Sequence, residues 1–370
     1  MKPDQLASFK ALFLFLFLAF DNLSYGTTYT WIPINGTGNA PAINDSGAIA
    51  GWSGGIGMNI AFGDAYSFSN GLFTNIGRPD GANAAFSTAI NNNGWIVGYG
   101  FPGPTQAPPT SGFLYHDGNM EVIFSSNTGA SAEDINDSGT VVGWTSSAGV
   151  ETALIYSNGT TTQIPGLIRG LQISNEGAIL GLSKDNEENL HLNILSNGQL
   201  QDLGISFPLT YQTEGGPLFT KWEFHMNNLG QIVGNYTNGT PFLYSDGQSK
   251  SFPTAPEGGI FYPSGINDLG QVVGNIISNG SSYGALYEND TYTPLAALLS
   301  DGPSTNKPYL AQAINNSGFI TASSFNTSYP SPFLMMPVPE PGISAFLMFG
   351  GSLFLFLRGR HRFMRRSLDR

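Results

Sequence analysis

The chain has 370 residues, of which only 11% are charged, and it contains 48 glycines, 23 prolines and no cysteine. The absence of cysteine excludes disulfide bonds, zinc–thiolate sites and thiol catalysis. Residues 27–357 carry six Lys or Arg against 23 Asp or Glu. This acidic body argues against nucleic acid as a partner, because phosphate binding needs a basic surface. Abundant Gly and Pro favour an all-β fold of many short strands joined by turns.

The amino terminus has the pattern of an export signal. Lys2 and Lys10 are followed by an uninterrupted apolar run over residues 11–20 (ALFLFLFLAF). Such a run is too short for a stable membrane anchor, and the small residues Ser24 and Gly26 suit the positions before a cleavage site. We therefore predict a signal peptide over residues 1–26, with a buried core helix as the alternative interpretation.

One phrase, Ile-Asn-x-x-Gly-x-(Ile/Val)-x-Gly, recurs through the body of the chain. The seven copies begin at Ile43, Ile90, Ile135, Ile173, Met226, Ile266 and Ile314. Their starts are 38 to 53 residues apart, a spacing typical of the blades of a β-propeller.

A second phrase, an apolar strand followed by a turn, comes after most copies, as in FLYHDG from Phe113 and FLYSDG from Phe242. Asn-Gly and Asp-Gly are strong signals for a two-residue hairpin turn. Each repeat then holds four strands, which is the content of one propeller blade. We predict an all-β, seven-bladed propeller of four-stranded blades over residues 27–336.

The two ends of the repeat region complement each other. The seventh copy stops after Phe333 and Leu334 without a fourth strand, whereas residues 29–33 (YTWIP) are similar to the fourth strand at residues 160–165 (TTTQIP). We expect the amino-terminal strand to complete the seventh blade, because a closed ring leaves no open strand edges. An open β-solenoid is the alternative architecture.

These phrases resemble the extracellular HAF repeat family, whose units read Ile-Asn-x-x-Gly-x-Val-Gly followed by Ala-Phe-Leu-Tyr. The resemblance covers residues 27–336 and implies an extracellular location, but little about chemistry. The chain departs from the pattern at Ser174, in place of Asn, and at Ala322, in place of the last Gly. We expect looser turns in blades four and seven.

The carboxyl terminus, residues 337–370, has three elements in order. The first is a four-residue motif made of Val338, Pro339, Glu340 and Pro341. An uncharged stretch over residues 343–357 and an Arg-rich end over residues 358–370 follow it. The arginines should hold the end on the cytoplasmic side of the inner membrane, and the stretch is a thin transmembrane helix.

This tail resembles the PEP-CTERM protein-sorting domain of Gram-negative bacteria. The resemblance implies that an exosortase, a membrane cysteine protease, recognises the four-residue motif and cleaves near it. The protein would then be exported, held in the cell envelope by its tail, and placed on the cell surface or released after processing. An ordinary tail anchor without processing is the alternative.

Few residues are arranged as a catalytic site or a metal site would require. Gly51-Trp52-Ser53-Gly54-Gly55 matches a hydrolase elbow by letter, but no helix is expected after it. The four histidines lie far apart in sequence, so we predict no catalytic zinc site. We also predict no cofactor and no catalytic residue. Asp45, Asp137 and Asp268 occupy equivalent repeat positions. They could bind calcium, or each could cap its own turn, which is the interpretation we favour.

Three aromatic residues follow the last repeat glycine in consecutive blades: Trp52, Tyr99 and Trp144. The later blades have Leu182, Asn235, Asn275 and Ser323 there. In a propeller these positions open loops on one face, so the rings are candidate platforms for stacking against sugars of an extracellular polysaccharide. The alternative is that the rings only cover the ends of the blades.

The favoured function is therefore a non-enzymatic scaffold or adhesion protein, exported and sorted through its tail, with a glycan-binding propeller. Its expected partners are the export machinery, the exosortase and a polysaccharide. The competing class is an extracellular glycan lyase or hydrolase on a propeller scaffold, which would use paired carboxylates.

Overall fold

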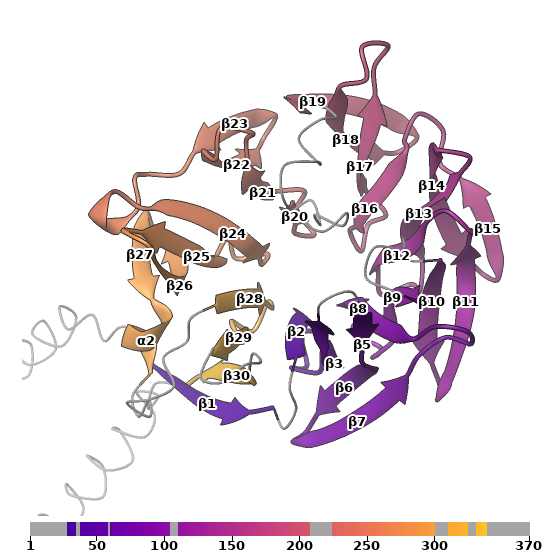
Figure 1. The fold of residues 1–370 in the computed structure, drawn as a ribbon. Helices are drawn as coiled ribbons and strands as arrows, with labels where there is room; N and C mark the ends of the chain where they lie inside the picture. Colours follow the sequence, from indigo (N-terminus) through magenta and orange to yellow (C-terminus); the bar gives the residue numbers. More distant parts are fainter. Residues whose placement is uncertain are drawn as a thin grey trace, which may run out of the picture. The chain divides into compact units, whose positions relative to one another are not determined.

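The computed structural model describes residues 28–34, 38–57, 60–103, 110–207, 224–299, 310–324 and 331–338. Residues 30–336 form one compact unit in which seven four-stranded antiparallel sheets are arranged around a ring (Figure 1). The predicted seven-bladed propeller is confirmed, and the open solenoid is excluded.

The blades are numbered one to seven in chain order, and the strands of each blade are given in order from the centre of the ring outward. The blades consist of β2 (Gly38–Ile43), β3 (Ile49–Ser53), β6 (Ala65–Ser69) and β7 (Leu72–Gly77); β8 (Ala84–Ile90), β9 (Ile96–Phe101), β10 (Ser111–His116) and β11 (Asn119–Ser125); β12 (Ala130–Ile135), β13 (Val141–Ser147), β14 (Val150–Ser157) and β15 (Thr160–Gln163); β16 (Arg169–Ile173), β17 (Ile179–Lys184), β18 (Leu190–Ser196) and β19 (Gln199–Phe207); β20 (His225–Met226), β21 (Ile232–Asn235), β22 (Pro241–Ser245) and β23 (Gln248–Ser251); β24 (Ile260–Ile266), β25 (Val272–Ser278), β26 (Ser281–Glu288) and β27 (Thr291–Pro294); and β28 (Leu310–Ile314), β29 (Ile320–Ser324), β30 (Ser331–Pro337) and β1 (Tyr29–Pro33).

The seventh blade joins the two ends of the repeat region, as expected. Its strand order is β28-β29-β30-β1, so the first strand of the chain lies at the rim beside the last one. Just beyond β1, the Ile34 amide donates to the Pro332 carbonyl oxygen at 3.0 Å. This pairing satisfies the free edge of β30, which an open array would leave exposed.

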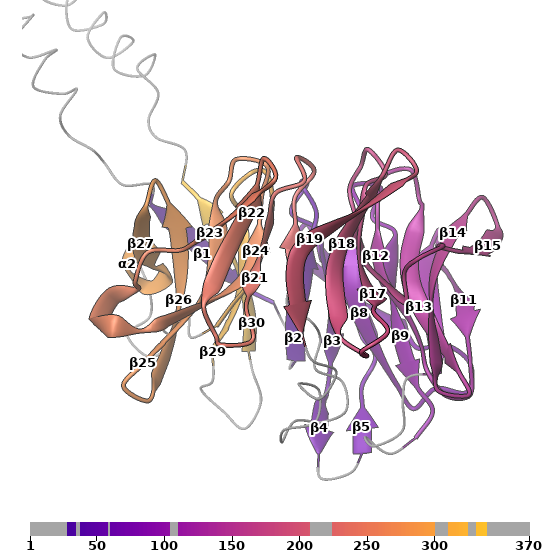
Figure 2. The ribbon, with the colours of Figure 1, turned by 90° about the horizontal axis from the view of Figure 1, so that it is seen from above.

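The propeller has two dissimilar faces. One carries the turns between first and second strands and between third and fourth strands; we call it the turn face. The opposite, loop face carries the other connections, including the hairpin of β4 (Gly55–Gly57) and β5 (Ile60–Phe62), which projects from one side of the ring in Figure 2. Turns at the turn face are tight: Asn158 and Gly159 have φ values of 51° and 77°, as a two-residue hairpin turn requires.

The last glycine of the repeat lies in the second strand, where blades are most crowded. A Cβ atom on Gly98 would lie 2.1 Å from the Phe86 carbonyl oxygen and 2.8 Å from the Phe113 ring. The neighbouring first strand bulges close to this point in six of the seven blades. Glycine avoids these contacts in six of the blades, whereas blade seven accommodates the methyl group of Ala322 at this point.

Helix is scarce in the described part of the chain. It comprises α2 (Leu295–Leu298) and the short 3₁₀ turn η2 (Pro256–Gly258). Within these described ranges, no helix is long and apolar enough to cross a membrane. The predicted signal peptide over residues 1–26 and the predicted membrane segment over residues 343–357 lie outside the described residues.

Of the four residues predicted to be a sorting motif, the structure describes only Val338, whose surface is 39% exposed. Its amide donates to the Thr28 carbonyl oxygen at 2.7 Å. Both residues belong to a second unit, made of residues 1–29 and 337–370. Pro339, Glu340 and Pro341 lie outside the described residues.

Candidate functional site

The repeat asparagines form a ring of hydrogen bonds on the turn face, here called the Asn ring. Its members are Asn44, Asn91, Asn136, Asn227, Asn267 and Asn315, all of them buried. Each Oδ1 accepts the backbone amide four residues on, as Asn91 does from Trp95 at 2.9 Å. Each Nδ2 donates to the equivalent backbone oxygen in the next blade, over distances of 2.7 to 3.3 Å. The repeat Asn therefore caps its own turn and also fastens two blades together.

The following residue of each copy forms a second ring, here called the Asx ring. Its members are Asp45, Asn92, Asp137, Asn175, Asn228, Asp268 and Asn316. Each backbone amide donates to the Oδ1 atom of the equivalent residue in the next blade, over 2.8 to 3.0 Å at all seven seams. The bond from Asn316 to Asp45 closes the circle.

The Asx ring corrects our interpretation of its aspartates. Asp45, Asp137 and Asp268 do not cap their own turns; each accepts the backbone amide of the preceding blade. Every Asp has an Asn on both sides, and the amides of these asparagines donate to its Oδ2 atom. Because no two carboxylates are adjacent, the ring avoids like-charge contacts. Among the residues described, no three His, Asp or Glu gather so that they could hold a metal ion.

Ser174 is the one interruption of the Asn ring. Its Oγ still accepts the Ala178 amide at 3.0 Å, and its backbone makes the usual turn bonds to Gly177 and Ala178, both at 2.9 Å. The turn of blade four is therefore not looser, contrary to our expectation. In blade seven the turn is also intact, with the Asn315 amide 3.0 Å from the Phe319 oxygen. What serine lacks is the amide that would donate across the seam to blade five.

Two of the three candidate aromatic platforms belong to one cluster. The rings of Trp52 and Tyr99 flank Phe86, with centroid distances of 4.7 and 5.5 Å, and Phe101 packs 5.5 Å from Tyr99. Trp52 and Tyr99 are half-buried, whereas Phe86 and Phe101 are buried. Burial, with a smaller effect of the Glu133 carboxylate, raises the pKa of the Tyr99 hydroxyl. The cluster joins blades one and two near the loop face.

Trp144 lies apart from this cluster and is only 8% exposed. The Arg169 guanidinium covers its ring, with the Cζ atom 4.3 Å from the centroid. Its Nε1 atom donates to Glu133 Oε1 at 2.9 Å, and Arg169 Nε donates to Glu151 Oε2 at 2.7 Å. A ring covered by a cation from the next blade offers little face to a ligand.

In later blades, the residue that follows the last repeat glycine fastens neighbouring blades to one another. Asn235 Nδ2 donates to the Phe261 oxygen at 3.0 Å, and Asn275 both accepts from and donates to the backbone of Ala311 in the next blade. At this position, the rings of Trp52 and Trp144 contact a residue in the first strand of the next blade, and amide groups make the equivalent contact in blades five and six.

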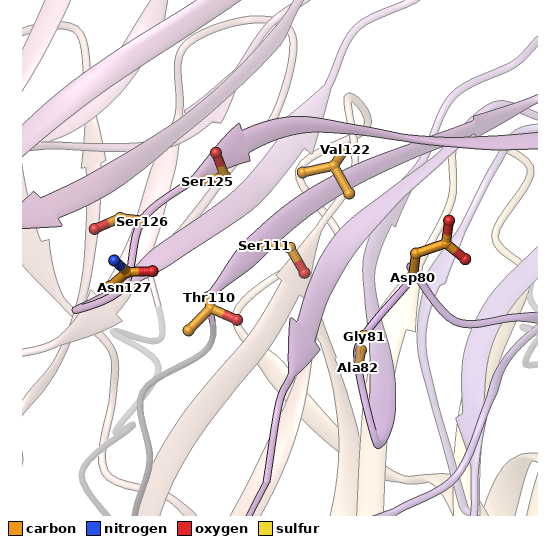
Figure 3. Close-up of a pocket in the computed structure, with 9 residues that line it drawn as sticks. All are labelled: Asp80, Gly81, Ala82, Thr110, Ser111, Val122, Ser125, Ser126 and Asn127. Atoms are coloured by element: carbon orange, nitrogen blue, oxygen red, sulfur yellow. The ribbon is translucent and has the colours of Figure 1, made fainter.

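A pocket opens on the loop face of blade two (Figure 3). It has a volume of about 550 Å³ and is lined by Asp80, Gly81, Ala82, Thr110, Ser111, Val122, Ser125, Ser126 and Asn127. Gly100, which follows Tyr99, borders it: a Cβ there would lie 2.7 Å from Ser111 Oγ and 3.0 Å from Ala82 Cβ. Strand β9 therefore separates the aromatic cluster from the pocket.

Sequence reasoning missed a small ionic cluster in blade four. His191 Nδ1 lies 2.8 Å from Asp202 Oδ2, and its Nε2 lies 3.2 Å from Asp185 Oδ2. Burial lowers the pKa of His191, but the bonds to both aspartates outweigh it and raise that pKa. Bonding to Asn189, opposed in part by desolvation, lowers the Asp185 pKa to about 2. In the register of β18 and β19, Asp202 lies opposite Asn193 and His191 lies opposite Ser206, with a bulge between them, so hairpin register alone does not predict the contact of His191 with Asp202.

Ser53, the serine of the elbow-like sequence, has a structural role. Its Oγ donates to the Asp64 carbonyl oxygen at 3.2 Å. The strand that contains it is followed by the β4–β5 hairpin and not by a helix, so the sharp strand-to-helix turn of a hydrolase nucleophile is not formed.

No family model and no curated protein matches this chain. Among solved structures, the β-propeller domain of the Trilobed protease from Pyrococcus furiosus is similar, with 10% identity and a TM-score of 0.49 over 82% of this chain and 94% of that one. A putative gluconolactonase has 10% identity and a TM-score of 0.40, over 85% and 93%. The lectin of Aleuria aurantia has 11% identity and a TM-score of 0.36, over 86% and 98%. The propeller assignment rests on the strand pairing of this chain itself.

Proposed function

We propose that this protein is an exported, non-enzymatic scaffold of the cell surface or extracellular matrix that binds polysaccharide at the loop face of blades one and two. The observation that carries the proposal is the half-buried pair Trp52 and Tyr99, held on either side of Phe86. Aromatic rings fixed by packing present a flat apolar surface at little entropic cost.

The two rings of the turn face support the scaffold role. Nineteen inter-blade hydrogen bonds, six from the Asn ring and thirteen from the Asx ring, connect neighbouring blades around the whole circle. Such a framework keeps the loop-face side chains of different blades at constant separation. A rigid arrangement of this kind favours binding of an extended, repetitive ligand.

Polysaccharide binding is tested by co-sedimentation of the purified full chain with the extracellular polysaccharide of the producing organism. We expect the double variant Trp52→Ala/Tyr99→Ala to bind about tenfold more weakly, because the stacking surface is lost. The matched control is Trp95→Ala, which removes another half-buried tryptophan from the turn face. Equal binding by the double variant and the wild type, with both folded by circular dichroism, would refute the proposed surface. Release of new reducing ends from the polysaccharide would refute the non-enzymatic role.

Export and sorting are the second part of the proposal, supported by the terminal sequence patterns. We infer that residues 1–26 are removed on export and that an exosortase recognises the motif at residues 338–341. Intact-mass analysis of protein from cell envelopes and from medium tests this. A species lacking about the first 26 residues and everything after about Pro341 is expected; a species that keeps the Arg-rich end would refute processing.

A further inference from the structure

We propose that the pocket on the loop face of blade two, here called the blade-two pocket, binds a neutral sugar residue of the polysaccharide. This inference rests on the proposed function and assigns the ligand class and the contacting residues. Two kinds of observation carry it: which side chains line the pocket without hydrogen-bond partners, and how firmly the backbone around them is held.

The lining has several exposed or half-buried polar side chains, both donors and acceptors, that have no hydrogen-bond partner among the described residues. Within the described residues, the side chains of Asp80, Thr110, Ser111, Ser125 and Asn127 make no hydrogen bond. Hydroxyl and amide groups can both donate and accept, and a carboxylate accepts. This mixture matches the hydroxyl groups of a sugar, each of which is also a donor and an acceptor. Figure 3 shows Asp80 and Asn127 at opposite ends of the pocket, with Thr110, Ser111 and Ser125 between them.

The lining also disfavours anionic ligands. It contains no Lys, Arg or His, and its single formal charge is the Asp80 carboxylate. An anionic sugar would meet this carboxylate without a compensating cation. Val122 is 46% exposed in the pocket wall, so the C–H face of a sugar ring would gain apolar burial there. The volume of about 550 Å³ is within the usual range of small-molecule sites.

The backbone around the pocket is fixed before any ligand arrives. The Thr110 amide donates to the Gly100 oxygen at 3.0 Å, and the Thr110 oxygen accepts the Ser126 amide at 3.1 Å. Ser111 pairs with Ser125 across β10 and β11, and the Ala82 amide closes a turn onto the Pro79 oxygen at 3.0 Å. Binding therefore requires little ordering of the main chain.

The experiment is saturation-transfer difference NMR on the purified full chain, with methyl α-D-glucopyranoside, methyl α-D-mannopyranoside and methyl β-D-galactopyranoside as neutral probes. Glucuronic acid is the anionic probe. We expect at least one neutral glycoside to bind, and glucuronic acid to bind about tenfold more weakly or not at all, because Asp80 repels it.

Two pocket variants test the contacts by different means. Asp80→Asn removes the carboxylate at an exposed loop position and should weaken neutral-sugar binding about tenfold. Ser125→Tyr fills the pocket from an exposed edge strand and should abolish binding. The matched controls are Asp246→Asn, in an exposed hairpin turn of the turn face, and Ser251→Tyr, at the equivalent end of the fourth strand in blade five. Both should bind within about twofold of the wild type.

The outcomes separate this proposal from the proposed function. If the wild type co-sediments with polysaccharide and both pocket variants bind it normally, the pocket assignment is wrong and the function stands. If neutral glycosides fail to bind while glucuronic acid binds, the ligand class is wrong. If neither polysaccharide nor any glycoside binds the wild type, both proposals are wrong.

Discussion

The gap in the Asn ring at Ser174 leads to a gain-of-stability prediction. In Ser174→Asn, the new Oδ1 would take over the Ala178 amide, which now lies 3.0 Å from the serine Oγ. The new Nδ2 would donate to the Asn227 carbonyl oxygen in blade five. The geometry permits this bond, because the Asn175 amide lies 2.8 Å from Asn228 Oδ1 across the same seam, a distance within the range found at the other seams.

The expected gain is small and measurable. A buried hydrogen bond contributes about 0.5–1.5 kcal/mol net, of which ordering the longer side chain removes a part. The unfolding entropy is about 2.1 cal/mol/K per residue, so for a body of roughly 300 residues the gain corresponds to a rise in Tm of about 1–2 °C. Differential scanning calorimetry on the full chain resolves such a shift.

Ser174→Asp is the matched control for this prediction. Aspartate has the size of asparagine and can accept the Ala178 amide, but its carboxylate cannot donate to the Asn227 oxygen. We expect no gain in Tm for this variant at neutral pH. If Ser174→Asn is no more stable than Ser174→Asp, the inter-blade bonds of the Asn ring do not stabilise the propeller as argued.

Further predictions concern other residues. Asn267→Ala removes donors to two oxygens and the acceptor of two turn amides, so we expect a loss of about 2–4 kcal/mol in urea unfolding. Gly98→Ala places a Cβ 2.1 Å from a backbone oxygen and should cost about 1–3 kcal/mol or more, whereas Gly103→Ala, with open space around it, should be nearly neutral in the same assay. Because the His191 pKa is raised in the folded state, its contribution should be fully present below the unfolded pKa of about 6.5 and lost as pH rises through the folded value. His191→Gln should therefore lower Tm at pH 5.5 and leave it unchanged at pH 9, with an effect under about 1 kcal/mol because the pair is partly exposed; an equal effect at both pH values would contradict this.

The number of blades and the closure of the ring are readable in the sequence. The repeated phrase and the Asn-Gly and Asp-Gly turns determine local strand and hairpin formation. The missing fourth strand after Leu334 and the extra strand at Tyr29–Pro33 predict closure, because only that pairing leaves no free edge. These features depend on residues close in sequence, or on simple counting of strands.

The contacts between blades were decided by the tertiary structure. Asn316 bonds to Asp45 across 271 residues, and Arg169 covers Trp144 from the next blade. Neither partner is visible from spacing, since both depend on how two sheets face each other. The Asp or Asn at the third position of the phrase is present in every copy, yet its side chain bonds to a neighbouring blade and not to its own turn.

The candidate site likewise has features that the sequence predicts and contacts that only the tertiary structure decides. The aromatic residues at positions 52, 99 and 144 share one repeat position, and sequence reasoning treated them as equivalent platforms. In the structure Trp52 and Tyr99 are half-buried members of one cluster, whereas Trp144 lies apart and is buried. The blade-two pocket is assembled from residues 80–82, 110–111 and 122–127, which no motif connects. Local patterns determine the elements of this protein, while its surfaces depend on the distances at which those elements pack.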